Sequence, residues 1–475
     1  QVNVISTETL FFTLELNRLS EAVLRKQLKD RAAQHYASWI RDVRVFRPHM
    51  LDDDLEKILH EKSVTGRASW VRLFDETQSA LRFPLGRKRL TMSEVLNLLS
   101  DRDGEKRKRA AKALGKVLGE NVRLFTLITN TLAKDKRIED EWRHYPSPLS
   151  SRNLGNYVED EVVEALTRSV ADAFPDLSHR YYRLKARWFG KRKLDHWDRN
   201  APLPGDSGRR YSWRQARELV LGAYGRFTPE MAATAERFFT NAWIDAAPRA
   251  GKDSGAFSHS TVPSVHPYIL MNFHGKARDV MTLAHELGHG VHQVLAGPQG
   301  TLMSDTPLTL AETASVFGEM LTFCAMLADE ADAGRRRILL AGKVEDMLNT
   351  VVRQVAFHRF EERVHDERAR GELSAERLGD IWMDAQRESL GPVFRFDDEY
   401  RNYWAYIPHF VHAPFYVYAY AFGDCLVNSL YGVFEGGHAD FQAKYLDMLA
   451  AGGTLRHKEL LAPFGLDAGD PAFWR

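Results

Sequence analysis

Residues 279–293 constrain the fold and the chemistry of this chain more than any other segment. Apolar residues recur there every three to four positions, which predicts a buried helix with Asp279 as its N-cap. The helix carries His285, Glu286 and His289 in the pattern His-Glu-x-x-His. Histidines four residues apart share one helical face, where two neutral imidazoles can bind a divalent metal ion, most often zinc. The alternative is a pair of core histidines that bind no metal.

A catalytic zinc site needs a third protein ligand. One class of zinc peptidase uses a histidine ten residues after the first, but Leu295 stands there in this chain. A second class uses a glutamate on a later helix, and a helix predicted to start at Thr306-Pro307 presents Glu312. Glu319, two turns further on, is expected to orient a ligating histidine from behind. A solvated acidic stripe fits poorly, because Leu, Ala, Phe and Met surround both glutamates.

The segments HELGHGVHQ (285–293) and AETASVFGE (311–319) together resemble the thimet oligopeptidase and oligoendopeptidase F family of zinc peptidases. Further segments that resemble oligoendopeptidase F in particular are 255–260, 267–273, 353–361 and 407–423, and those at 11–17 and 65–74 resemble the family more weakly. The resemblance implies a mostly α fold, with two helical lobes around a deep substrate channel and a small β-sheet next to the metal-binding helix. Family members carry more helical sequence ahead of Gln1, so we expect the N-terminal lobe to be incomplete here.

A segment rich in imidazole and phenol groups is the candidate for binding the oxyanion of a tetrahedral intermediate. Pro414 is predicted to start a helix on which Tyr416 and Tyr420 share one face. The family resemblance implies that a histidine and tyrosines from this segment lie over the scissile carbonyl. His409 is preferred as that histidine, and His412 stays open as the alternative. An aromatic stripe that only packs in the core is the other reading of these tyrosines.

The chain is predicted to divide into an N-terminal helical lobe (1–150) and a zinc peptidase catalytic domain (151–475), joined at a Pro/Ser-rich linker. Residues 336–370 are predicted to form one long helix. The one clear strand, 268–273, precedes the metal-binding helix and should lie beside the metal. As an edge strand it could pair with an extended peptide, although an ordinary packed strand fits the sequence equally well.

Composition excludes some classes of partner. Lys and Arg number 65 against 64 Asp and Glu, so the formal charge of +1 gives no reason to expect nucleic acid or a membrane surface. The basic run 105–109 is read as a solvated helix face, and no long apolar run is apparent. Cys324 and Cys425 are read as buried thiols, which favours a reducing compartment and a cytoplasmic protein. The oligomeric state is left open.

The sequence therefore predicts a zinc metalloendopeptidase that hydrolyses short unstructured oligopeptides, with one Zn²⁺ per chain held by His285, His289 and Glu312. Zinc would lower the pKa of a bound water to about 7. Glu286 would take the proton and later deliver it to the leaving amine. His292, one turn beyond His289, is read as a supporting or core histidine. The rival functions are an exopeptidase on the same scaffold, which needs a charged pocket for a peptide terminus, and a non-catalytic peptide-binding form.

Overall fold

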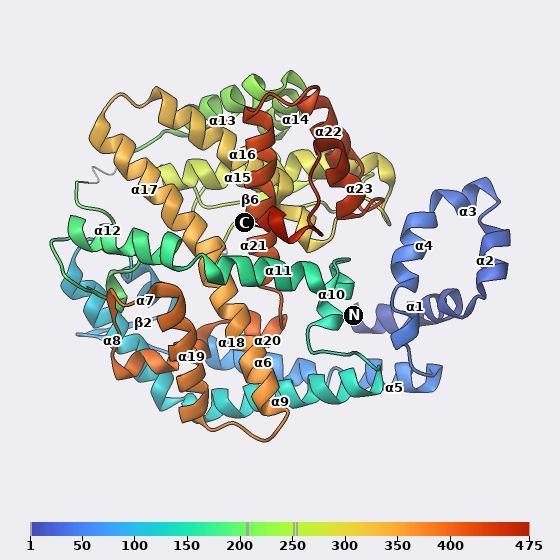
Figure 1. Cartoon of the computed structure of the whole chain (residues 1–475), viewed down its shortest axis with the longest axis horizontal. Coiled ribbons are helices and arrows are strands. Elements are labelled where there is room, and N and C mark those ends of the chain that lie inside the picture. Colours follow the sequence, from blue (N-terminus) through green and yellow to red (C-terminus); the bar gives the residue numbers. More distant parts are fainter. Residues whose placement is uncertain (1, 206–208, 250–251, 253–254, 475) are drawn as a thin grey trace.

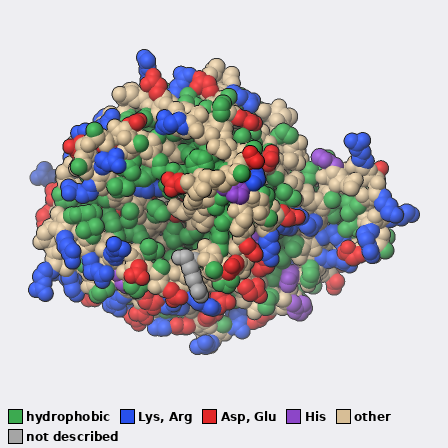
Figure 2. All heavy atoms as spheres, turned by 45° about the horizontal axis from the view of Figure 1, so that its top comes forward, with side chains coloured by type: hydrophobic (Ala, Val, Ile, Leu, Met, Phe, Trp, Pro, Cys, Tyr) green, Lys and Arg blue, Asp and Glu red, His purple; other side chains and the backbone are tan. Residues whose placement is uncertain are grey.

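The computed structural model describes residues 2–205, 209–249, 252 and 255–474, and the side chains from residue 5 onward. Helices make up most of it, with three small sheets, in agreement with the predicted mostly α class (Figure 1). Helices α1–α4 project from one side of the molecule, at the right of Figure 1. Positive and negative side chains are interspersed over the face in Figure 2, as expected for a chain with little net charge.

The N-terminal region consists of helices and one hairpin. Its helices are α1 (Val2–Arg18), α2 (Glu21–Gln27), α3 (Arg31–His35), α4 (Ala37–Arg44), α5 (Asp53–Lys62), α6 (Arg67–Ala80), α7 (Met92–Leu98), α8 (Gly104–Glu120) and α9 (Val122–Trp142). The hairpin pairs β1 (Phe83–Leu85) with β2 (Lys88–Leu90) and was not predicted. The basic run is also only partly solvated, because Arg107 on α8 is buried and lies 2.8 Å from the buried carboxylate of Asp198.

The rest of the chain is again mostly helical. Its helices are α10 (Ser150–Gly155), α11 (Asp160–Asp172), α12 (Arg180–Trp188), α13 (Trp213–Phe227), α14 (Pro229–Thr240), α15 (Ala277–Ala296), α16 (Leu308–Asp329), α17 (Ala333–Thr350), α18 (Val352–Arg368), α19 (Ala375–Leu390), α20 (His409–His412), α21 (Tyr418–Glu435), α22 (Phe441–Ala450) and α23 (His457–Leu461). Its strands are β3 (Leu194–Asp195), β4 (Ile244–Asp245), β5 (Phe257–His259), β6 (Tyr268–Leu270) and β7 (Phe394–Arg395). A nine-residue 3₁₀ helix, Asp398–Tyr406, precedes α20.

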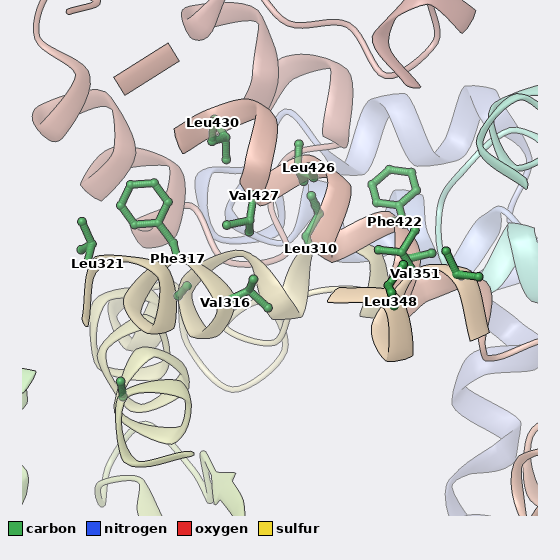
Figure 3. Close-up of a cluster of buried hydrophobic side chains, with 14 of the residues drawn as sticks. Leu310, Val316, Phe317, Leu321, Leu348, Val351, Phe422, Leu426, Val427 and Leu430 are labelled. Carbon is green, nitrogen blue, oxygen red and sulfur yellow. The ribbon is translucent and has the colours of Figure 1, made fainter. Parts of the chain in front are cut away.

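Two clusters of buried apolar side chains hold these helices together. The larger cluster packs α15, α16 and α21 against α11, α13 and α14. Figure 3 shows Leu310 and Phe317 of α16 beside Leu426, Val427 and Leu430 of α21. The second cluster joins α6, α8 and α9 to α18, α19 and the segment 400–417. Helix α18 belongs to both clusters, since Val355 packs in the first and Phe360 in the second. The predicted boundary between 150 and 151 stays a prediction.

Helix α16 is apolar enough, by length and composition, to cross a membrane, so the expectation that the chain has no long apolar run was wrong. About two thirds of this apolar stretch (67%) is buried inside the protein, as in a core helix. Phe317, at the centre of α16, is completely buried between helices.

Three predicted element boundaries differ from the structure. Residues 336–370 form two helices, α17 and α18, rather than one. The helix is interrupted at Val351, whose backbone φ of −100° and ψ of −68° are not those of a regular α-helix. Pro414 does not start a helix: it lies in a turn, and α21 begins at Tyr418. Helix α16 begins one residue later than predicted, with Pro307 as its N-cap.

The predicted strand is shorter than expected, and it is not an edge strand. β6 spans three residues and pairs on one side with β4, in parallel, and on the other side with β5, antiparallel. Its backbone groups are therefore occupied within the sheet, and β5 is the edge strand next to it. The sequence did not show this, because the parallel partner at Ile244 lies in a segment without strand-like alternation.

Candidate metal-dependent active site

Helix α15 places two histidines at the edge of the larger core cluster. His285 and His289 lie one turn apart, with ring centroids 5.0 Å apart, and their side chains are 28% and 19% exposed. The intervening Leu287 is fully buried and anchors the helix. Lys276 is the N-cap rather than Asp279, which is the third helical residue. The Asp279 carboxylate accepts the backbone N–H groups of Lys276 (2.9 Å) and His274 (2.7 Å).

A glycine allows α16 to approach α15 closely at this point. A Cβ on Gly288 would lie 2.4 Å from the carbonyl oxygen of Ala314 and 2.6 Å from the Cα of Ser315, so no larger residue fits there. The close approach brings Glu312 opposite both histidines. Its Oε2 lies 3.3 Å from Nε2 of His285 and 3.5 Å from Nε2 of His289.

His285, His289 and Glu312 form a donor set that suits a metal ion. One ligand atom from each lies within 4.8 Å of the other two. Two imidazole nitrogens and a carboxylate oxygen are the ligand types of a catalytic zinc site, which keeps a fourth position open for water or substrate. The residues present therefore fit a divalent ion such as zinc.

A second row of polar groups fixes the orientation of these three residues. Glu319 Oε2 lies 3.5 Å from Nδ1 of His285, as predicted, and the Ser315 hydroxyl donates to Glu312 Oε2 (2.7 Å). Lys343, on α17, is buried, and its Nζ lies 2.8 Å from Glu319 Oε1. The sequence did not point to Lys343, because a lysine among the charged residues of α17 carries no sign of burial. A hydrogen-bonded partner behind a ligating histidine fixes its ring orientation.

Glu286 lies between the two histidines in sequence but faces the small sheet. It is 6% exposed, and it takes a hydrogen bond from the backbone of Ser258 on β5. Gln293 ties the same strand to α15, because its Nε2 donates to the Ser258 carbonyl (3.2 Å). The small sheet thus lies next to the helix, as predicted. Burial raises the pKa of the Glu286 carboxyl above its usual value, which favours acceptance of a proton.

Three of the four candidate oxyanion donors, His409, Tyr416 and Tyr420, lie together in the aromatic segment, and His412 lies apart from them. His409 Nε2 lies 3.2 Å from the Tyr420 hydroxyl, and the rings of Tyr416 and Tyr420 are 5.2 Å apart. Burial raises the pKa of both phenols, and the negative charge of Glu312 adds to this shift, so both hydroxyls lie near the candidate metal ligands. His412 instead lies 2.7 Å from Asp75 on α6, at the surface.

The other residues of this region have structural surroundings. Asn156 donates to the hydroxyl of Tyr418 (2.8 Å), which points away from Tyr420 as predicted. His292 is buried, outside the three-ligand group, and burial lowers its pKa to about 4. Cys324 and Cys425 are free thiols and are half-buried.

The candidate active site opens into a cavity of about 1140 Å³. His285, Glu286, Glu312 and Tyr420 line one part of its wall, and charged residues of both signs line the remainder together with apolar side chains. Ligand pockets for small molecules typically occupy about 300–1,000 Å³. The cavity therefore has room for a ligand larger than a single amino acid.

The fold and the site together define a mostly helical metallopeptidase of the His-Glu-x-x-His type. A sequence profile described as Peptidase family M3 matches residues 226–475, slightly more than half of the chain, and one described as Oligopeptidase F matches residues 15–83. The chain belongs to peptidase family M3, as the two motifs predicted.

Sequence alignments to similar proteins extend over nearly the whole chain. Oligopeptidase PepF of Bacillus subtilis is 28% identical over 470 residues, which are 97% of this chain and 69% of that protein. An oligoendopeptidase F homolog of Lactococcus lactis is 26% identical and covers 96% of this chain and 77% of its own length. A crystal structure of a Chlamydophila abortus protein superposes with a TM-score of 0.87 at 25% identity, over 98% of this chain and 79% of that one. Oligoendopeptidase-F from Enterococcus faecium gives a TM-score of 0.79 at 23% identity, over 99% and 81%, and supports the fold.

Proposed function

We propose that this chain is a zinc-dependent endopeptidase that hydrolyses peptide bonds in short unstructured oligopeptides. The observation that carries the proposal is the convergence of His285, His289 and Glu312, of which His285 and Glu312 line the wall of a large cavity together with Glu286. The names of the Bacillus and Lactococcus relatives, which are oligopeptidases, support the substrate class.

His285, His289 and Glu312 would hold the zinc ion, and Glu319 with Lys343 would keep the His285 ring in place. When bound, zinc supplies Lewis acidity, which polarises a carbonyl oxygen and makes water a stronger nucleophile. Glu286 then accepts a proton from the attacking water and passes it to the nitrogen of the leaving amine. Its burial suits this role, because a raised pKa strengthens the carboxylate as a base.

The oxyanion that forms at the peptide carbonyl needs hydrogen-bond donors placed in advance. Tyr420 and His409 lie in contact with each other, and Tyr420 lines the cavity. Tyr416 stands beside Tyr420, with ring centroids 5.2 Å apart. We assign donation to the oxyanion to Tyr420 first, with His409 and Tyr416 as supporting donors. Burial lowers the pKa of His409, so its ring stays neutral near pH 7.

We also propose that two helical lobes enclose a deep substrate channel around the site. A cavity that encloses the site admits a flexible peptide chain, whereas a folded protein cannot bring a peptide bond to Glu286. The activity should therefore be high on short unstructured peptides and very low on a native folded protein of the same composition.

A single experiment tests the proposal. The purified chain loaded with zinc, and its Glu286→Gln variant, are incubated with an unstructured peptide, and the products are identified by mass spectrometry with and without a chelator. We expect internal cleavage by the wild type, its loss with chelator, and retained zinc but lost turnover in the variant, because the amide cannot accept the proton. Cleavage at a near wild-type rate by Glu286→Gln would remove Glu286 as the base. Release of terminal residues only would favour the exopeptidase alternative.

A further inference from the structure

A second cavity of about 200 Å³ adjoins the candidate active site. Arg353 and Asn200 line both cavities, so the two cavities share a wall. We call the smaller cavity the arginine pocket, because the guanidinium groups of Arg199 and Arg353 line it. His196 lines it too, and its Nε2 lies 3.1 Å from Oδ1 of Asp397. The other residues used here are Trp382, Tyr400 and Tyr406.

Neither arginine has a counter-ion in contact with it, although Glu345 acts on Arg199 from a longer distance. Against the effect of burial, Tyr400 and other groups that include Glu345 raise the pKa of Arg199. Within the part of the chain that the structure describes, no carboxylate lies within 4 Å of either guanidinium. Arg199 donates only to the side-chain oxygen of Asn200 (3.3 Å), and Arg353 donates to the Tyr406 hydroxyl (3.3 Å) and lies over the Phe357 ring at 4.9 Å. Burial, and then the positive charge of Arg199, lower the pKa of Arg353. Two like charges in a half-buried pocket destabilise each other, so an anion bound between them would remove a real energetic cost.

The pocket also has more hydrogen-bond donors than acceptors. The Nε of Arg353 and the Nε1 of Trp382 are buried and have no hydrogen-bond partner among the described residues. Gln386 lies behind the two arginines, its Oε1 accepts from the Tyr400 hydroxyl (3.0 Å), and its Nε2 donates to no described residue. Buried donors normally find acceptors. A bound group with acceptor oxygens and negative charge would satisfy these donors and the two guanidinium charges together.

We propose that the arginine pocket binds a carboxylate of the substrate peptide, held by the paired guanidinium groups of Arg199 and Arg353. This inference rests on the proposed function, since it assigns a subsite to the same substrate. Guanidinium forks match a carboxylate with two parallel hydrogen bonds. The aromatic walls, Tyr400, Tyr406 and Trp382, suit the apolar part of one residue, and the small volume suits a single side chain or chain end.

The position of the pocket agrees with this assignment. Arg353 lies near the proposed oxyanion donors, because its charge, after burial, contributes to the lowered pKa of His409. A peptide whose scissile bond lies at Glu286 can therefore extend past His409 towards Arg353. The carboxylate has two sources, the C-terminus of the peptide and an acidic side chain, and both have the same chemistry.

Three peptides of one sequence separate these sources. The first has a free C-terminal carboxylate and no acidic residue, the second is its C-terminal amide, and the third is the amide with one Glu in the last position. We expect the wild-type enzyme to prefer the free acid over the amide by about 10-fold to 100-fold in kcat/KM, the range for a hydrogen bond to a charged group. Recovery of the rate with the Glu-containing amide would show that an acidic side chain also fills the pocket. Equal rates on all three peptides would overturn the proposal.

Charge-removing variants locate the effect. Arg353→Gln and Arg199→Gln should each reduce the preference for a carboxylate to near one. Arg359→Gln is the matched control, since Arg359 lies on the same helix but at the surface, 3.8 Å from Glu388, and should keep the preference. Arg353→Lys keeps the charge and not the fork, and should retain part of it. A preference that survives in both Gln variants would overturn the assignment to this pocket.

Binding measurements keep this test separate from the test of catalysis. In the Glu286→Gln background, the dissociation constants of the free-acid and amide peptides should differ by the same 10-fold to 100-fold factor, with no turnover required. A carboxylate preference in binding without any cleavage by the wild type would support the pocket and contradict the peptidase mechanism. Thermal unfolding of each variant shows whether it has folded, and Arg353→Lys gives the answer if Arg353→Gln does not fold.

Discussion

Helix α21 supports the third candidate metal ligand through a glycine, and this contact yields a quantitative prediction. A Cβ on Gly423 would lie 2.8 Å from Cβ of Glu312 and 3.4 Å from its Cγ. Carbon atoms in contact normally lie about 3.5–4.0 Å apart. In Gly423→Ala, therefore, Glu312 or one of the two helices must move by roughly 1 Å.

The expected cost has two parts. Overpacking of a core costs about 1–3 kcal/mol, while replacing a helical glycine by alanine returns about 1 kcal/mol, so the net loss of stability is at most about 2 kcal/mol. The larger effect should be on the metal. Glu312 Oε2 now lies 3.3 and 3.5 Å from the two imidazole nitrogens, and a displaced carboxylate no longer meets both histidines. We expect zinc affinity to fall by about 10-fold to 100-fold, as when the support of a ligand is removed.

Gly432→Ala provides the control. Gly432 lies on the same helix, and a Cβ there would meet nothing within 4 Å. This variant should gain up to about 1 kcal/mol of stability and keep its zinc affinity. Competition with a chelator gives the affinity, and thermal unfolding of the metal-free forms gives the stability. If Gly423→Ala and Gly432→Ala bound zinc equally well, the close packing of α21 would not position Glu312, or Glu312 would not be a ligand.

Three further variants test other contacts of the site and its surroundings. Lys343→Met should weaken zinc binding by about 10-fold or more, because Glu319 loses its partner, and chelator competition would detect it. Tyr420→Phe should lower kcat by about 10²–10³-fold with little change in KM, as for one oxyanion donor, whereas Tyr418→Phe should keep kcat. Glu361→Gln should gain stability relative to wild type as the pH rises. Burial raises the pKa of Glu361 from its usual 4.5 to about 8, so the folded wild type holds a proton that the unfolded chain releases above pH 4.5. The wild type therefore loses about 3 kcal/mol between pH 4.5 and 7 that the variant keeps. Urea unfolding at both pH values measures the free energy of unfolding of the wild type and of the variant. If the variant and the wild type differed by the same amount at both pH values, Glu361 would be ionised in the folded protein.

The sequence predicted that the three candidate metal ligands would lie close together, because their positions follow from local geometry. The spacing of His285 and His289 fixes their common face once the segment is helical. Glu312 follows from a second helix on which, apart from Glu319, mostly apolar and small residues surround it. Tyr416 and Tyr420 were correctly placed side by side, although the helix that was expected to carry both begins only at Tyr418.

The sequence did not predict features that depend on partners far along the chain. β6 lies inside its sheet because Ile244 pairs with it, and Lys343 is buried because α17 packs over Glu319. The choice between His409 and His412 could not be made locally, since Asp75, on α6, is what holds His412 at the surface. The break at Val351 has neither a glycine nor a proline to mark it.

The second core cluster has a consequence for synthesis of the chain. Apolar residues of α8 and α9, such as Leu114, Phe125 and Leu132, are covered by residues of α18, α19 and the segment 400–417. A ribosome adds roughly 5–20 residues per second, so these partners emerge roughly 10–55 s after α9 has left it. During that interval the nascent N-terminal helices expose apolar faces that no neighbour can cover, and this stage of biogenesis is where the chain most needs a chaperone.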